Sequence, residues 1–333
     1  MLCPIDSGSR YGQGLEKELE GRISLGKLLK VGVIGLGAMG RNHLRVYSEL
    51  PDIELAGIAD MNVESAESMA EKYHSQPFTD YKRLLRSGLD AVSIVVPTSL
   101  HHEVALETAR AGVNMLIEKP IAHTLRAAEE MIRMAAENKV KLMVGHLERF
   151  NPAVAVVKKE IEGSQVCSIE ITRVGPFPPR IKDVGVILDL GTHDIDLVRY
   201  ITASEFRKVY CLTSRNSGAY EDAAILLGEM ENGILARITI NWLTPFKVRE
   251  VSIATRERFI KASLIDQKVT EYGKYQDNAY LAKELNVPYG EPLKLELEAF
   301  IDCLRSNNPP PISGEEGLKA LEIALQCLKD SHV

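Results

Sequence analysis

The pattern of apolar and polar residues changes character near residue 150. Between residues 31 and 145, short runs that are apolar nearly throughout alternate with Ala- and Glu-rich stretches of helical periodicity. Strands of this kind are typical of a parallel sheet that helices cover on both faces. We therefore predict a doubly wound α/β domain with strands over 31–35, 53–59, 91–96, 113–117 and 140–145 and helices over 41–50, 63–73, 101–111 and 125–138.

The second half of the chain is predicted to consist mainly of strands. Residues 166–174 alternate as a half-buried strand does, and the Pro-rich tract 175–180 is incompatible with a helix. Strands with few helices between them indicate an α+β domain with an open, mainly antiparallel sheet. The other predicted elements are strands over 223–227, 234–242 and 249–254 and helices over 189–201, 292–304 and 315–330. We expect an N-terminal extension over 1–30, a first domain over 31–150 and a second over 151–333.

Length, charge and cysteine content narrow the possible classes of protein. A chain of 333 residues is long enough for two domains with separate cores. The 40 Lys and Arg against 46 Asp and Glu give a net charge of −6 without a concentrated basic segment, so nucleic acid is not expected as a partner. No apolar run approaches the roughly 18 to 20 residues that cross a bilayer. The 5 scattered cysteines support neither a disulfide framework nor a zinc knuckle, and the N-terminal residues do not resemble a secretory signal, so we expect a cytoplasmic protein.

A glycine motif at the first predicted strand–helix turn indicates dinucleotide binding. Gly35, Gly37 and Gly40 form a G-x-G-x-x-G sequence directly after a strand and directly before a helix. The first glycine permits a tight turn, the second lets a pyrophosphate approach the backbone, and the third allows close contact between helix and strand. The helix N-terminus around Ala38 and Met39 adds unpaired N–H donors and a partial positive charge.

Asp60 completes this motif at the end of the second predicted strand, about twenty residues further on. Its carboxylate can accept hydrogen bonds from both ribose hydroxyls and would repel a 2′-phosphate. The expected cofactor is therefore NAD rather than NADP. The alternative is a glycine-rich turn that only packs, but this does not account for the strand, the helix and Asp60 together.

Lys119 is a candidate for catalysis. It follows Glu118 at the end of the fourth predicted strand, at the carboxyl edge where open α/β sheets bind ligands. An ammonium there can stabilise the charge on a hydroxyl that is losing its proton. The alternative is a solvated surface lysine. Pro120 restrains the local backbone and Glu118 can hold the ammonium, which favours the functional interpretation.

A predicted helix places three more polar side chains on one face. Asp189 and His193 are four residues apart, and Asp196 lies three residues beyond His193. A histidine beside a carboxylate titrates near neutrality and can accept a hydroxyl proton. The alternative is an N-capping aspartate followed by an exposed histidine. No metal site is expected, because no cysteine or second well-spaced histidine completes one, and the same holds for His101 and His102.

In their order and number, these motifs resemble those of the Gfo/Idh/MocA oxidoreductases over about residues 31–330. The resemblance implies a Rossmann domain that binds NAD and a second domain that binds substrate and forms a homodimer or homotetramer. It also implies that Lys119, Asp189 and His193 act on the reacting hydroxyl. The matching pieces are Gly35 to Gly40, the loop Pro97 to His101, the tripeptide Glu118-Lys119-Pro120 and the Asp189-x-x-x-His193 helix, and the residues then expected along the nicotinamide are Thr98, His101 and Glu118.

Two further segments, 146–152 and 173–180, resemble the branch of this family that oxidises the 3-hydroxyl of UDP-linked N-acetylhexosamines or their uronic acids. Arg149, Asn151 and Arg180 are then expected beside the substrate, together with Lys119 and His193, because guanidinium groups bind diphosphates and carboxylates bidentately. The alternative for these arginines is surface charge or an interface.

We expect His193 to remove the hydroxyl proton, Lys119 to stabilise the alkoxide, and Asp189 to orient the substrate or the imidazole. Two other functions stay open at this point: an inositol or free-sugar dehydrogenase, and a non-catalytic sensor that binds a dinucleotide.

Overall fold

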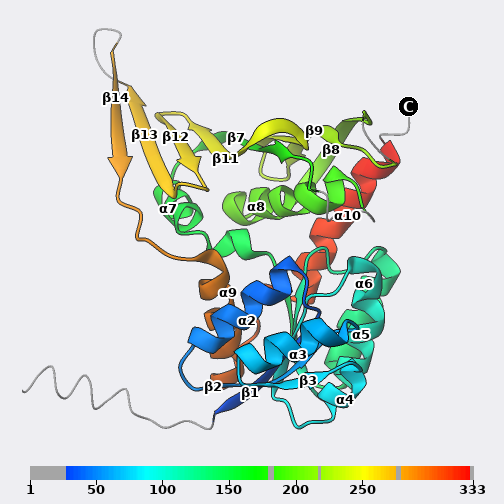
Figure 1. Ribbon diagram of the computed structural model, residues 1–333. Coiled ribbons are helices and arrows are strands. Elements are labelled where there is room, and N and C mark those ends of the chain that lie inside the picture. The colour runs from blue at the N-terminus through cyan, green and yellow to red at the C-terminus, as the bar shows by residue number, and fades with distance from the viewer. Residues whose placement is uncertain (1–27, 179–183, 217–218, 275–278, 331–333) are drawn as a thin grey trace, which may run out of the picture.

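Two sheets organise the chain in the computed structural model, which describes residues 28–178, 184–216, 219–274 and 279–330 (Figure 1). The first sheet has six parallel strands in the order β3-β2-β1-β4-β5-β6. The second has eight strands in the order β14-β13-β12-β11-β7-β10-β9-β8, all antiparallel except the β7–β10 pair. The predicted fold class, a Rossmann sheet followed by a mainly antiparallel one, is confirmed.

The first domain follows the predicted alternation of strands and helices. Its strand order reverses between β1 and β4, which is the position where doubly wound sheets bind ligands. Strand β3 and helix α4 were not predicted, because they are too short to show a period. The elements are β1 (Leu29–Ile34), α2 (Ala38–Glu49), β2 (Ile53–Ala59), α3 (Val63–Lys72), β3 (Gln76–Phe78), α4 (Tyr81–Leu85), β4 (Ala91–Ile94), α5 (Thr98–Arg110), β5 (Asn114–Glu118), α6 (Leu125–Glu137) and β6 (Leu142–Gly145).

The second sheet is larger than the sequence pattern predicted. The unpredicted strands β12 to β14 form one end of it, and β14 is exposed along nearly its whole length, so it carries no buried face that a period could report. The elements are η1 (Leu147–Phe150), α7 (Pro152–Glu160), β7 (Val166–Pro176), η2 (Ile187–Gly191), α8 (Thr192–Thr202), β8 (Phe206–Ser214), β9 (Ala223–Met230), β10 (Leu235–Asn241), β11 (Leu243–Thr255), β12 (Arg258–Ser263), β13 (Lys268–Lys274), β14 (Tyr280–Leu285), α9 (Pro292–Arg305) and α10 (Gly314–Asp330).

Helix α8 lies between the second sheet and the first domain (Figure 1). It buries apolar side chains, among them Ile195, Leu197 and Val198, beneath the sheet. Helix α10 contacts α6 and β6 of the first domain as well as α8 and β8 of the second, and α9 packs against α2. Helix α10 therefore connects both halves and supports α8 above the first domain, and α9 adds a contact with the first domain. Within the described residues, no helix is long and apolar enough to span a membrane.

Candidate active site

The loop after β1 requires its glycines for three different reasons. Gly35 has a φ of +99°, and a Cβ there would lie 2.6 Å from the Val95 carbonyl oxygen. A Cβ on Gly40 would overlap the carbonyl oxygen of Gly35. Gly37 is different, because a Cβ there would meet no protein atom within 4 Å. Gly37 is also the N-cap of α2 and supplies no side-chain cap, so open space and free N–H donors lie where a pyrophosphate would bind.

Asp60 is held beside this loop by backbone donors. Its Oδ2 accepts from the Leu36 amide at 2.7 Å and its Oδ1 from the Asn62 amide at 2.8 Å. A carboxylate offers about four lone-pair sites, so both oxygens can accept further hydrogen bonds from ribose hydroxyls. The next residue, Met61, is 87% exposed and uncharged, so it offers no partner to a 2′-phosphate. These residues fit a dinucleotide cofactor.

Lys119 and Asp189 meet at the boundary between the two domains. Lys119 directly follows β5, and its Nζ donates to the Asp189 carbonyl oxygen at 2.6 Å and to Asp189 Oδ1 at 3.1 Å. The two side chains are 12% and 14% exposed. Asp189 lies in η2, a π-helical turn that precedes α8, so the predicted helix starts with a wider turn than expected. An ammonium fixed in this way is available to a reacting oxygen.

His193, in the first turn of α8, is half-buried, and its Nδ1 has no hydrogen-bond partner in the described part of the chain. Burial, together with the positive charges of Lys119 and Arg173, lowers the pKa of His193 well below its ordinary value of 6.5. The expectation that a neighbouring carboxylate keeps the pKa of His193 near neutral pH is wrong, because Asp189 pairs with Lys119 and Asp196 pairs with Arg149. His193 is therefore neutral at physiological pH and able to accept a proton.

Glu118 is tied to the interior of the first domain rather than to Lys119 Nζ. Its Oε1 lies 3.3 Å from His43 Nε2, and its Oε2 accepts from the Lys119 amide at 3.2 Å. His43 Nδ1 is 3.0 Å from Ser93 Oγ, which in turn is 2.9 Å from the Tyr47 hydroxyl. Burial raises the pKa of Glu118, but the contact with His43 and the charge of Lys119 outweigh it and bring that pKa below the ordinary value. This buried series of hydrogen bonds thus holds the ionised Glu118 carboxylate next to Lys119.

His101 connects two loops at the carboxyl edge of the first sheet. Its ring nitrogens each lie 3.0 Å from a backbone oxygen, one of Pro120 and one of Val96. The ring is buried, so both nitrogens face protein and neither is free for a cofactor. Thr98 begins α5 and is half-buried. His101 is in place to hold the backbone after Lys119, and the predicted contacts of Thr98 and His101 with nicotinamide stay predictions.

The residues predicted to bind substrate through η1 have structural partners. Arg149 donates to both carboxylate oxygens of Asp196, at 2.8 and 2.6 Å, and to Glu316 at 2.7 Å. The Asn151 side chain caps α7 at Ala153 and donates to the Leu264 carbonyl oxygen. These bonds hold η1 against α8, α10 and the second sheet. Contacts of Arg149 and Asn151 with substrate stay predictions, and Arg180 lies outside the described residues.

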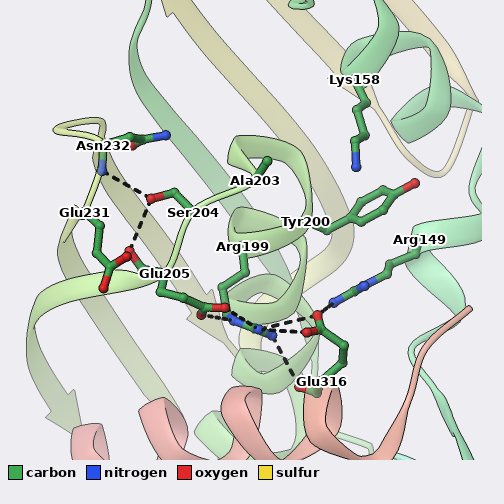
Figure 2. Close-up of a pocket in the computed structure, with 10 residues that line it drawn as sticks. All are labelled: Arg149, Lys158, Arg199, Tyr200, Ala203, Ser204, Glu205, Glu231, Asn232 and Glu316. Atoms are coloured by element: carbon green, nitrogen blue, oxygen red, sulfur yellow. Dashed lines mark hydrogen bonds and ion pairs between the residues drawn. The ribbon is translucent and has the colours of Figure 1, made fainter.

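A pocket of about 580 Å³ opens beside the C-terminal half of α8 (Figure 2). Figure 2 shows Arg149 extending to Glu316 and Lys158 pointing at the ring of Tyr200, with its Nζ 3.5 Å from the ring centroid. Tyr200 is seven residues beyond His193, or about 10 Å along the helix. Neither Lys119 nor His193 lines this pocket, so it is separate from the candidate catalytic residues.

Two more arginines act electrostatically on His193: Arg173, at the start of the predicted segment 173–180, and Arg249, which no predicted motif includes. Arg173 on β7 and Arg249 on β11 are opposite one another in the strand register, and both charges lower the pKa of His193. Arg173 is buried and donates to Glu148 and Asp194, each at 2.8 Å. In the alternating pattern of β7, Arg173 follows Ile169 and Ile171 at the next buried position. A charged residue at a buried position of a strand was the sequence signal that could have identified Arg173 as a candidate functional residue.

No three His, Cys, Asp or Glu side chains in the described ranges gather closely enough to hold a metal ion.

Two segments of the chain match models of known protein families. Residues 29–146 match a model described as an oxidoreductase family with an NAD-binding Rossmann fold, and residues 165–259 match the GFO/IDH/MocA C-terminal domain.

Several characterised proteins are similar to the chain over most of its length. UDP-N-acetylglucosamine 3-dehydrogenase of Acidithiobacillus ferrooxidans is 30% identical over 309 residues, covering 90% of this chain and 96% of that protein. A solved structure of that enzyme aligns with a TM-score of 0.85, covering 91% and 97% of the two chains. The scyllo-inositol 2-dehydrogenase (NAD(+)) of Bacillus subtilis is 26% identical over 318 residues, covering 89% of this chain and 92% of that protein.

Proposed function

This chain belongs to the Gfo/Idh/MocA oxidoreductases, and we propose that it uses NAD to oxidise C3 of a UDP-linked N-acetylhexosamine or of its uronic acid. The observation that carries the proposal is the fixed ammonium of Lys119, bonded to Asp189 beside a neutral His193 at the carboxyl edge of the Rossmann sheet. The choice of a UDP-sugar is supported by the similarity to UDP-N-acetylglucosamine 3-dehydrogenase.

The residues divide the chemistry between them. When bound, the nicotinamide ring accepts the hydride that leaves the carbon. His193 takes the proton of the secondary hydroxyl, and Lys119 stabilises the negative charge that develops on its oxygen. Asp189 holds the Lys119 ammonium through two hydrogen bonds. The Glu118 carboxylate contacts His43 and accepts from the Lys119 amide, and these two contacts fix the backbone that carries Lys119. Asp60 favours NAD over NADP, because its carboxylate lies beside the glycine loop where it would repel a 2′-phosphate.

The proposal is tested by mixing the purified protein with NAD and single sugars and following NADH absorbance. The panel contains UDP-N-acetylglucosamine, its uronic acid, myo-inositol and glucose. We expect NADH with a UDP-sugar and, with NAD present, protection by that sugar against thermal unfolding. Binding without NADH formation would support a non-catalytic sensor instead. A polyol substrate is the second candidate, since an inositol dehydrogenase also aligns with the chain, and NADH with inositol alone would favour it.

We also propose that the protein is a homodimer or homotetramer that associates through the outer face of the second sheet. There, Tyr210 and Leu212 on β8 pair with Leu227 and Ile225 on β9, and all four side chains are exposed. Adjacent exposed apolar side chains on one sheet face are typical of an interaction surface.

A further inference from the structure

Arg249 lies where the covered face of the second sheet ends. Along β11, Val251 and Ile253 point to the same face as Arg249, and both are buried. The Arg249 side chain, in contrast, is 39% exposed. Its neighbour across the strands, Arg173, is only 3% exposed. Arg249 is thus the member of this pair that a ligand can reach.

One carboxylate oxygen serves both arginines. Glu148 Oε1 accepts from Arg173 at 2.8 Å and from Arg249 Nη1 at 3.2 Å. Arg173 has a second strong bond, from its Nε to Asp194. For the Arg249 side chain, the contact with Glu148 is the one hydrogen bond found within the described ranges, although a guanidinium has five N–H donors. The fork of Arg249 therefore has donors left for an acceptor that the protein does not supply.

A group of charged side chains links Arg249 to His193. Burial and the charge of Arg173 lower the pKa of Arg249, and the carboxylates of Glu148, Asp194 and Asp189 only partly compensate. The same positive charge acts on His193. Arg249 also faces Arg173 across the strands, and Arg173 is bonded to Asp194, the residue that follows His193.

We propose that Arg249 binds an oxyanion of the substrate, a carboxylate or a phosphate, beside the hydroxyl that is oxidised. This assignment rests on the proposed function for the position of that hydroxyl. It makes Arg249 a residue that determines specificity, because a neutral polyol would offer no anionic acceptor to the guanidinium donors that Glu148 leaves free. A lysine at this position would keep the charge but lose the bidentate geometry.

The test compares wild type, Arg249→Gln and Arg249→Lys by calorimetric titration with two ligands. Each protein is saturated with NADH, which cannot accept a hydride, so that the heat reports binding and not turnover. UDP-N-acetylglucosamine and UDP-N-acetylglucosaminuronic acid share a diphosphate and differ in one carboxylate. We expect Arg249→Gln to raise the Kd of the bound oxyanion ligand about 10- to 100-fold and Arg249→Lys to restore part of the loss. Loss for the uronic acid alone identifies the carboxylate, and equal loss for both ligands identifies the diphosphate.

Arg256→Gln is the matched control, since Arg256 is exposed in the turn between β11 and β12 and should bind both ligands as wild type does. NAD affinity and the melting temperature of each variant are measured in parallel. Equal Kd values for wild type and Arg249→Gln with both ligands would overturn the assignment, as would failure of the wild type to bind either ligand. A fall in kcat without a change in Kd would also overturn it, because this is the result of a purely structural role. Binding that depends on Arg249 without NADH formation would refute the dehydrogenase proposal instead.

Discussion

The Lys119 ammonium and Asp189 are joined by two hydrogen bonds, of 2.6 Å to the carbonyl oxygen and 3.1 Å to the carboxylate. The first residue follows a Rossmann strand and the second lies in the π-helical turn of the other domain. The position of the reactive cation therefore depends on both domains. Any ligand that changes their arrangement will also move this cation relative to the reacting oxygen.

Replacement of Lys119 by Met should abolish most turnover. Methionine keeps the length of the side chain but removes the charge that stabilises the alkoxide, so we expect kcat to fall about 100- to 1,000-fold. NAD binding, measured by fluorescence titration, should be unchanged because the glycine loop is untouched. Turnover close to wild type would refute the role of Lys119.

Replacement of Asp189 should have a graded effect. Asp189→Asn keeps the carbonyl bond to Lys119 and weakens only the side-chain bond, so we expect a loss of about 10-fold or less in kcat. Asp189→Ala removes the side-chain partner completely and should be the slower variant. The reverse order of the two kcat values would contradict the positioning role.

In the pH profile of kcat/KM, the loss of activity on the acid side should occur at an unusually low pH. Neutral His193 is the base, and protonation below its pKa stops the reaction. Since burial and the nearby cations lower that pKa well below 6.5, activity should persist at pH 6 rather than fall by half near 6.5. Rates are measured from pH 4.5 to 9. An acid limb centred at or above pH 6.5 would show that another group is the base.

Gly37→Ala should separate cofactor binding from folding. A Cβ at Gly37 meets no protein atom within 4 Å, so the fold should tolerate it, but the methyl group would occupy the space beside the pyrophosphate. We expect the Kd for NAD to rise about 10-fold or more, since displaced hydrogen bonds to a charged group are strong. Gly273→Ala, whose Cβ also meets nothing within 4 Å, is the control and should leave NAD binding and melting temperature unchanged.

Glu296 should make the protein less stable as pH rises. Both carboxyl oxygens are buried without a hydrogen-bond partner in the described residues, and burial, with repulsion from Glu118, raises the pKa of Glu296 well above 4.5. Above pH 4.5 the unfolded chain loses this proton while the folded protein keeps it, so the stability that it contributes at low pH declines until the folded pKa is passed.

Glu296→Gln removes this titration. Its free energy of unfolding in urea should exceed that of wild type at pH 8 by on the order of 1 kcal/mol, and the difference should shrink toward pH 4.5. Glu298→Gln, on the same helix but less buried, is the control. A difference between Glu296→Gln and wild type that does not vary with pH would contradict the assignment.

The apolar outer face of β8 and β9 predicts the behaviour of the protein in solution. The double variant Tyr210→Glu, Leu227→Glu places two charges on neighbouring strands of this face. We expect light scattering to report an oligomer for wild type and a smaller species for the variant, with unchanged circular dichroism. A monomeric wild type would refute the proposed association.

Local chemistry along the chain was sufficient to determine much of the first domain. Apolar strands alternating with amphipathic helices predicted its sheet, and the three glycines and Asp60 predicted a dinucleotide loop, because turn geometry and helix ends depend on neighbouring residues. The positions of Lys119 and His193 were also readable, since each follows a recognisable local pattern. Strands such as β14 were not, because an exposed strand lacks an apolar face.

Only the tertiary structure decided which charged groups meet. Asp189 pairs with Lys119, 70 residues away, rather than with His193, and Asp196 pairs with Arg149. The pKa of His193 falls because the ring is buried and because the cations Lys119, Arg173 and Arg249 act on it. Arg249 is brought to this region by the pairing of β11 with β7. Electrostatic effects act through space, so residues that are distant in the sequence determine them, and no local pattern in the sequence contains that information.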